Sequence, residues 1–283
     1  MEPGHPSRTL LRSAIRRASH QLLDNPVIFH DPIIAGLVPE AADPAIRNAL
    51  DDEGAPPPKV FRYLFALRNR FAEDRLAQAA ARGARQYLIL GAGLDTFAWR
   101  QPSFGRNLRI FAADHPASLA WTQQRLRERG LAIPPNLTFV PVDLESRRVG
   151  DALTACGFDP GQMSFCSMLG VTQYLSGWAL RDVLGFAAAL GASSEIVFTF
   201  VPPDDDLNAD DIRGVTHSMA RTASLGEPWK TRIGAGELTR TMRALGFSDI
   251  LHLTPDAAIR SHLADHHNIG NAPGWEQFIA AVV

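Results

Sequence analysis

The feature that most constrains the fold of this chain is a short apolar run, residues 87–90, that leads directly into the turn Gly91-Ala92-Gly93. An apolar run bounded by glycine is consistent with a buried strand, and the two glycines let the backbone turn tightly and approach a ligand closely. In open α/β sheets, ligands bind outside the carboxyl ends of the strands. The segment therefore predicts the first strand of an α/β sheet, with a ligand crevice at its end.

Short apolar runs and helix-length segments alternate after this turn, which is typical of parallel strands joined by right-handed crossovers. Further strands are predicted at residues 108–113, 137–142, 163–168, 195–201 and 247–253, and helices at residues 117–129, 178–190 and 238–245. A last strand, residues 275–283, is expected to run antiparallel at an edge. The pattern predicts a Rossmann-like α/β fold, a mostly parallel seven-stranded sheet with helices on both faces.

Two segments interrupt this alternation. Residues 1–83 are expected to form an N-terminal helical cap packed on a core of residues 84–283. The predicted elements of the cap are helices at residues 9–23 (with a basic face) and 59–82, and helix starts at Asp31-Pro32 and Asp43-Pro44. Residues 202–236 are polar and too long for an ordinary connection. This insertion before the sixth strand is expected to act as a lid.

Composition and charge limit the partners of the chain. Its 283 residues carry 28 Lys and Arg against 30 Asp and Glu, a formal net charge of −2 at pH 7. This balance gives no basic excess that would favour nucleic acid or an anionic membrane, and no run of about 18 apolar residues is present. No signal peptide is recognised, and Cys156 and Cys166 are expected to be buried free thiols. We therefore expect a cytoplasmic protein, monomeric or homodimeric, without nucleic-acid or membrane partners.

The glycine turn alone does not identify the ligand. The nicotinamide-dinucleotide fingerprint needs a third small residue three positions after Gly93, where this chain has Thr96, and Asp95 would lie near a dianionic pyrophosphate. Both residues disfavour a nicotinamide-dependent oxidoreductase. A ligand with a cationic centre and no phosphate fits better, and S-adenosylmethionine carries a sulfonium, an ammonium and one carboxylate.

Acidic residues follow the next two predicted strands. Asp114 can accept hydrogen bonds from ribose hydroxyls; alternatively, it caps a helix that begins at Pro116. Asp143 can accept from an adenine amino group while the backbone N–H of Leu144 donates to the ring; alternatively, Asp143 only caps a loop. Together with the glycine turn, these residues predict an adenosyl cofactor bound across three strand ends.

Several segments resemble a known family. LGAGLDTFAWR, FAADHP, VDLE, GFDP and GVTQYLS occur in the order and spacing of the leucine carboxyl methyltransferase-like family, which includes many bacterial small-molecule O-methyltransferases. RRASHQLLDNP, FHDPIIAGLV and RNRFAED extend the resemblance, which runs from Thr9 to Phe200. It implies a class I S-adenosylmethionine-dependent methyltransferase with a small-molecule acceptor, acting by O-methylation, with secondary metabolism as the expected setting.

The resemblance also implies roles for individual residues. Arg68, in the stretch that matches the family's Arg-Thr-Arg-Phe pattern, would hold the methionine carboxylate through a charge-assisted bond; the alternative is an exposed helix arginine, and Asn69 replaces the usual threonine. The other implied cofactor contacts are Gly91 and Gly93 beside the cofactor, Asp114 at the ribose, and Asp143 and Leu144 at adenine.

Two positions depart from the family pattern. Members usually carry glutamate two positions before the ribose aspartate, where this chain has Ala112, and glutamate in a Glu-Gly-Leu-Leu-x-Tyr-Leu stretch, where it has Leu169. Leu169 would lie at the junction of cofactor and acceptor. The alternative hypothesis is therefore a protein that keeps the cofactor but catalyses a different reaction or only binds.

Few residues qualify as catalytic. A carboxylate acceptor is already ionised near pH 7 and needs no general base, whereas a phenol or alcohol benefits from one. His217, in the insertion, is the first candidate base, ahead of His115 and His20, and Tyr174 and Trp99 are candidates to line the acceptor pocket.

A metal is not expected. The spacing of His262 and His266 fits one helix face, but Asp265 is the only acid near these histidines and His267, and no cysteine is nearby.

Overall fold

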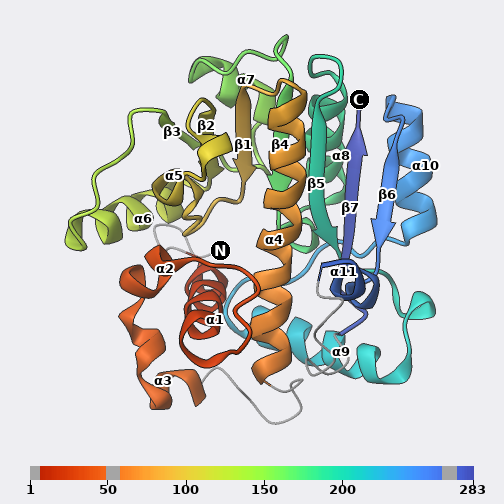
Figure 1. Ribbon diagram of the computed structural model, residues 1–283. Coiled ribbons are helices and arrows are strands. Elements are labelled where there is room, and N and C mark those ends of the chain that lie inside the picture. Colours follow the sequence, from red (N-terminus) through yellow and green to blue (C-terminus); the bar gives the residue numbers. More distant parts are fainter. Residues whose placement is uncertain (1–6, 49–57, 263–272) are drawn as a thin grey trace.

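A computed structural model of the chain describes residues 7–48, 58–262 and 273–283. Its centre is one seven-stranded sheet with the order β3-β2-β1-β4-β5-β7-β6 (Figure 1). The strands are β1 Gln86–Leu90, β2 Arg109–Asp114, β3 Leu137–Pro141, β4 Ser164–Met168, β5 Glu195–Phe200, β6 Ile250–Leu253 and β7 Gln277–Val282. The Rossmann-like α/β fold class predicted from the sequence is confirmed.

The last strand, β7, lies inside the sheet. The pairings among β1 to β5 are parallel, and β7 is antiparallel to both of its neighbours, β5 and β6. Its direction was predicted correctly, but its place at an edge was wrong, because Ile279 pairs with Phe198 of β5 and with His252 of β6. Residues 278–281 are all buried and apolar, which suits an interior strand. The short, partly exposed β6 forms the edge instead.

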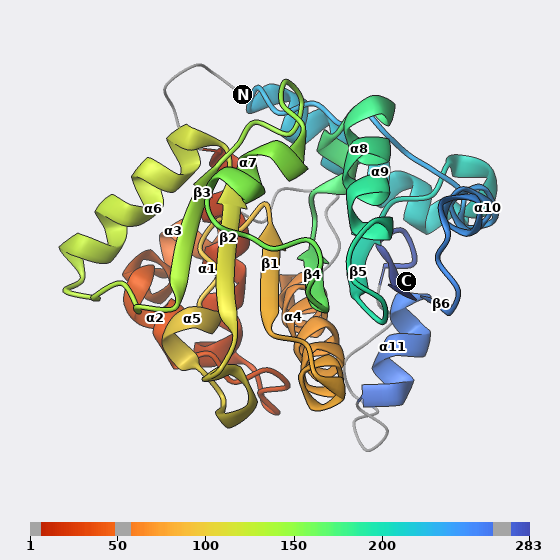
Figure 2. The same ribbon diagram turned by 90° about the horizontal axis from the view of Figure 1, so that it is seen from above.

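Helices cover both faces of the sheet (Figures 1 and 2). The helices are α4 (Pro58–Arg82) and α11 (Pro255–His262) on one face, and α7 (Val149–Ala155), α8 (Gly177–Ala188) and α10 (Ala235–Leu245) on the other. Successive side chains of β1 point to opposite faces, so Tyr87 and Ile89 pack in the core beneath α4 while Leu88 and Leu90 pack beneath α8. Burial on both faces explains why this strand is continuously apolar rather than alternating.

Six further α-helices and four 3-10 helices complete the described part of the chain. These helices are α1 (Arg8–Leu23), α2 (Pro32–Leu37), α3 (Pro44–Asn48), α5 (Phe97–Arg100), α6 (Pro116–Glu128) and α9 (Ala209–Ser224), with 3-10 helices η1 (Pro39–Ala42), η2 (Ser103–Gly105), η3 (Thr172–Tyr174) and η4 (Asp204–Asp206). In Figure 1, β1 and β5 point downward and α1, α2, α3 and α9 lie below them. The predicted starts of α2 and α3 are confirmed, since Asp31 accepts from Ile34 N at 3.1 Å and Asp43 from Ala45 N at 2.8 Å. The division into cap and core stays a prediction.

Some elements were not expected from the sequence. The polar insertion contains α9, which begins where Asn208 accepts from the N–H groups of Asp210 and Asp211; α7 and α11 were also missed. Cys166 is buried as predicted, but Cys156 is only half-buried, because it follows the end of α7.

Neither a membrane span nor a metal cluster is found within the described ranges. No helix there is long and apolar enough to cross a bilayer, and no group of three or more His, Cys, Asp or Glu side chains is placed to hold a metal. The histidines considered as a superficial metal pattern lie outside this description: His266 and His267 entirely, and His262 in its side chain.

Candidate cofactor and acceptor site

A cavity of about 530 Å³ lies at the carboxyl ends of the central strands and is lined by α1, α4 and α9 as well as by the strand-end loops. Its wall includes residues from each segment in which the sequence predicted a functional residue. All the predicted cofactor-binding and catalytic residues line it: Arg68, Gly91, Gly93, Asp114, Asp143, Leu144, Leu169, Tyr174 and His217. The structure therefore brings together residues that are up to 149 positions apart in the sequence, from Arg68 to His217 (217 − 68).

The glycine turn after β1 has a geometry that requires glycine. Gly91 and Gly93 have φ angles of +68° and +51°, in the left-handed region that disfavours side chains. A Cβ on Gly91 would overlap Val171 Cγ2, and one on Gly93 would lie 3.2 Å from Leu10 Cγ of α1. The turn is thus enclosed by the segment after β4 on one side and by α1 on the other.

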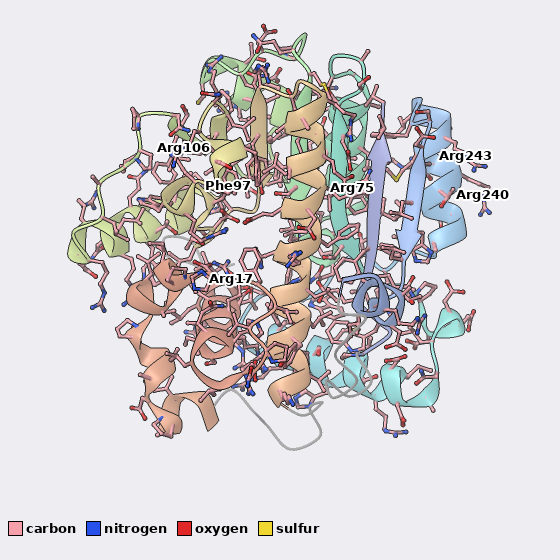
Figure 3. All side chains as sticks on the ribbon, in the orientation of Figure 1. Arg17, Arg75, Phe97, Arg106, Arg240 and Arg243 are labelled. Atoms are coloured by element: carbon pink, nitrogen blue, oxygen red, sulfur yellow. The ribbon has the colours of Figure 1, made fainter. Side chains whose placement is uncertain are left out.

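Arg17 of α1 contacts the same turn from the side of the N-terminal helices. Figure 3 labels Arg17 on the side of α1 that faces the sheet. Its guanidinium donates to the carbonyl oxygen of Leu94 at 2.9 Å and to Asp31 Oδ2 at 3.3 Å, and Thr96 Oγ1 donates to the same Asp31 oxygen at 2.6 Å. The N-terminal helices therefore fix the glycine turn through a buried carboxylate.

Asp114 is directed at the glycine turn and does not cap α6. Its carboxylate accepts from the backbone N–H groups of Gly93 and His115, both at 2.7 Å. The N-cap of α6 is His115, whose Nδ1 accepts from Ala117 N at 3.2 Å, so the capping alternative for Asp114 was wrong. Burial raises the pKa of Asp114, and the two N–H donors oppose this rise. Each oxygen holds one donor and can accept another from a ligand.

Asp143 caps its own loop and also lines the cavity. Its Oδ1 accepts from Glu145 N at 3.0 Å and its Oδ2 from Ser146 Oγ at 3.0 Å, so the loop-cap alternative is confirmed as a contact. Both Asp143 and Leu144 nevertheless contribute to the wall of the cavity. The cap fixes the loop that follows β3, which includes Leu144 at the wall of the cavity.

Arg68 is a buried residue of α4, not an exposed helix arginine. Its side chain is 8% exposed, its guanidinium lies 3.9 Å from the centre of the Phe65 ring, and its Nη1 donates to Glu276 Oε1 at 2.6 Å. Glu276 immediately precedes β7 and also lines the cavity. Sequence reasoning missed Glu276, because only the position of β7 inside the sheet brings this residue to α4.

Aromatic side chains contribute to the remaining wall of the cavity. They are Phe61, Phe65, Tyr174, Trp229 and Trp275. Burial raises the pKa of Tyr174, and the nearby carboxylates of Glu227 and Glu276 raise it further. Tyr174 therefore stays a neutral phenol near pH 7. His217 lies on α9 at the same cavity, and no hydrogen bond to its ring is recorded within the residues that the structure describes.

The insertion is tied to the start of α1 by Glu227. Its carboxylate accepts from Ser7 Oγ at 2.9 Å, from Arg8 N at 2.6 Å and from Thr9 Oγ1 at 2.5 Å. Glu227 is 8% exposed. Because Ser7, Thr9 and Glu227 all line the cavity, this contact joins two distant segments over the same space.

Three other residues considered from the sequence have different places. His115 reaches the cavity, but its ring caps α6. His20 is buried away from the cavity, where its Nδ1 lies 2.9 Å from Asp24 Oδ2, so its candidacy as a base was wrong. Trp99 does not line the cavity either, because its Nε1 donates to Ala132 O at 2.8 Å, on the outside of the glycine turn.

The fold and the site define a class of protein. A glycine turn after β1, an aspartate at the end of β2 and an aspartate after β3 meet at the point where the strand order reverses, which is where Rossmann-like sheets bind nucleotide cofactors. A sequence model described as "Leucine carboxyl methyltransferase" matches residues 10–188. The chain belongs to the leucine carboxyl methyltransferase family and is an S-adenosylmethionine-dependent methyltransferase.

Individual relatives agree with this assignment. The chain is 29% identical over 277 residues to the "Putative S-adenosyl-L-methionine-dependent methyltransferase YktD" of Bacillus subtilis, covering 90% of this chain and 91% of that protein. It is 37% identical over 128 residues to a protein of Frankia alni with the same description, covering 45% and 44%. A solved structure described as a putative methyltransferase from Thermobifida fusca superimposes with a TM-score of 0.59 at 19% identity, covering 99% and 96%, and shows the same fold.

The residues present fit S-adenosylmethionine as the cofactor. Gly91 and Gly93 line the cavity without side chains of their own, and Asp114 offers acceptors to a ligand. The Nε of Arg68 is buried without a hydrogen-bond partner within the described residues, so it can still donate to a ligand anion.

Proposed function

We propose that this methyltransferase transfers the methyl group to an oxygen, a carboxylate or a hydroxyl, of a small molecule of secondary metabolism. The observation that carries the proposal is a cavity whose wall combines the strand-end residues, aromatic side chains and residues of α1 and α9. Its volume of about 530 Å³ lies within the range of about 300–1,000 Å³ typical of small-molecule sites. A cavity of this size, lined by aromatic side chains, favours a small acceptor over the surface of a protein.

The cofactor would occupy the strand-end side of this cavity. In this placement Arg68 holds the methionine carboxylate, the turn from Gly91 to Gly93 lies against the methionine and ribose, Asp114 accepts from the ribose hydroxyls, and Asp143 and Leu144 bind adenine. Leu169 then lies between cofactor and acceptor. When bound, S-adenosylmethionine supplies a methyl group activated by a sulfonium.

The residues of the acceptor side would align the nucleophile and exclude water, which is the main requirement of an in-line transfer. For a hydroxyl acceptor, His217 would take the proton; its ring lines the cavity and has no competing hydrogen bond within the described residues. Tyr174, held neutral by its raised pKa, would donate a hydrogen bond rather than act as a base. A carboxylate acceptor needs no proton transfer, so His217 would then only bind.

The test is methylation of a panel of small carboxylic acids and phenols, followed by mass spectrometry. With a phenol, His217→Gln is expected to lower kcat by about 10²- to 10⁴-fold while leaving the affinity for S-adenosylhomocysteine unchanged. With a carboxylic acid the loss is expected to be small. His252→Gln is the matched control, because His252 lies on β6 and pairs with Gln277 Oε1 at 2.7 Å, outside the cavity. Cofactor binding without methylation of any acceptor would favour the alternative, a fold that keeps the cofactor for a different reaction.

The monomeric or homodimeric state and the cytoplasmic location stay predictions from the sequence. Neither is needed for the proposal, because every residue that it uses comes from one chain.

A further inference from the structure

Arg68 and Glu276 place opposite charges side by side in the wall of the cavity. Arg68 Nη1 donates to Glu276 Oε1 at 2.6 Å, and the two side chains are only 8% and 4% exposed. Removing two charges from water is costly unless they are paired and further hydrogen-bonded. The pair joins α4 to the residue before β7, 208 positions later in the chain.

This pair leaves hydrogen-bonding capacity open on both partners. Arg68 Nε is buried and has no partner among the described residues. Glu276 Oε1 accepts from both Arg68 and Thr199 Oγ1, the latter at 2.9 Å, whereas no described residue donates to Glu276 Oε2. The N–H donor at Arg68 Nε and the acceptor oxygen Glu276 Oε2 therefore remain for a ligand. A group with both charges, such as an amino-acid zwitterion, matches this arrangement.

The pair also lies against the backbone that follows β4. Thr199 Oγ1, which donates to Glu276, accepts from Gly170 N at 2.8 Å. A Cβ on Gly170 would overlap Arg68 Nη1, so the guanidinium is in close contact with this backbone. Leu169, immediately before Gly170, is the position at which the family resemblance implies an acid. Two hydrogen bonds through Thr199 thus link the Glu276 carboxylate to Gly170, the residue that follows this position.

Glu276 also lies outside residues 10–188, the part of the chain that matches the family. We propose that Glu276 takes the place of the acid missing at Leu169 and, together with Arg68, binds the amino-acid end of the cofactor. Glu276 accepts from the ammonium while Arg68 donates to the carboxylate. This inference rests on the proposed placement of the cofactor and is independent of the acceptor.

A binding comparison isolates the amino-acid end. S-adenosylhomocysteine has the ammonium and the carboxylate, whereas 5′-methylthioadenosine has the adenosyl part without either. Calorimetric titration of the full chain with each compound is carried out for the unchanged protein and for Glu276→Gln, which preserves the side-chain shape and can still accept from Thr199 and Arg68.

The matched control is Glu195→Gln. Glu195 is 1% exposed, lies on β5, and accepts from Arg75 at 2.5 Å and Arg82 at 2.6 Å, but it does not line the cavity. Figure 3 labels Arg75 on α4 beside β5. The control therefore removes a buried glutamate charge from an arginine pair between the same layers without touching the proposed site.

We expect Glu276→Gln to weaken the binding of S-adenosylhomocysteine by about 10- to 100-fold, the range for loss of a hydrogen bond to a charged group. The affinity for 5′-methylthioadenosine should not change. Glu195→Gln should change neither affinity. Equal weakening of both compounds, or unchanged binding of S-adenosylhomocysteine, would overturn the role of Glu276. Tighter binding would overturn it too, because it would show that Glu276 competes with the ligand carboxylate for Arg68. If the unchanged protein binds neither compound, the cofactor placement fails instead.

Discussion

Replacing Gly91 by alanine tests whether the glycine turn is fixed by backbone geometry, by contact, or by both. Gly91 has a φ of +68°, and its added Cβ would overlap Val171 Cγ2. The left-handed backbone costs about 1–2 kcal/mol for a residue with a side chain. Overpacking against the neighbouring segment adds about 1–3 kcal/mol. Gly91→Ala should therefore lower the free energy of unfolding by about 2–5 kcal/mol.

Gly130 is a matched control for the backbone contribution. Its φ of +67° is nearly the same, yet nothing lies within 4 Å of the Cβ that alanine would add. Gly130→Ala should therefore show the backbone cost alone, about 1–2 kcal/mol. The difference between the two variants measures the contact.

Val171→Ala supplies the second half of the comparison. It removes Cγ2, and the Val171 Cβ that remains would lie 3.5 Å from the new Cβ, an ordinary contact. In urea unfolding, the Gly91→Ala/Val171→Ala double variant should be more stable than the sum of the two single changes predicts, by about 1–3 kcal/mol. The reasoning is refuted if Gly91→Ala costs no more than Gly130→Ala, or if the two changes add without coupling.

Three other changes have defined outcomes. Burial raises the pKa of Glu73 from 4.5 to about 6 despite the hydrogen bond and charge of Arg100. The folded state then binds the proton more tightly than the unfolded state, so the free energy of unfolding should fall by about 2 kcal/mol as the pH rises from below 4.5 to above 6. Glu73→Gln should remove that change in urea unfolding, and an unaltered pH slope would contradict the assignment. Asp114→Asn replaces the carboxylate that accepts from two backbone N–H groups by an amide, so S-adenosylhomocysteine should bind about 10- to 100-fold more weakly by calorimetry. An unchanged affinity would exclude Asp114 from the site. Glu227→Ala removes the acceptor for three donors at the start of α1, so hydrogen exchange at Arg8 N should quicken by about 10-fold or more, and unchanged exchange would show that this contact does not hold the helix.

The sequence predicted the positions of the strand-end residues at the cavity correctly, because those positions are set locally. A glycine turn follows β1, Asp114 ends β2 and Asp143 follows β3, so each residue is placed by the strand beside it in the sequence. Parallel strands bring their carboxyl ends to one edge, which makes it possible to expect these residues together without knowing the strand order. Arg68 was found only through resemblance, since a helix arginine carries no local sign of its burial.

Other residues could not be assigned from local patterns. Trp99 follows the glycine turn closely, yet its side chain does not line the cavity and donates to Ala132 O instead. His20 has the spacing of a helix-face residue, but its ring is buried against Asp24. In both cases the side a residue faces depends on which elements pack around its helix, and the sequence pattern does not specify that.

By itself, the sequence determined the class of fold, the glycine turn and the strand-end acids, because short-range periodicity and turn residues set these features. Only the tertiary structure decided that β7 lies between β5 and β6, which carries Glu276 to Arg68, and that the insertion returns to α1, which carries Glu227 to Arg8. These contacts join residues 208 and 219 positions apart. Such partners are chosen by the burial of whole sheet and helix faces, and neighbouring residues along the chain do not reveal which distant segment will cover them.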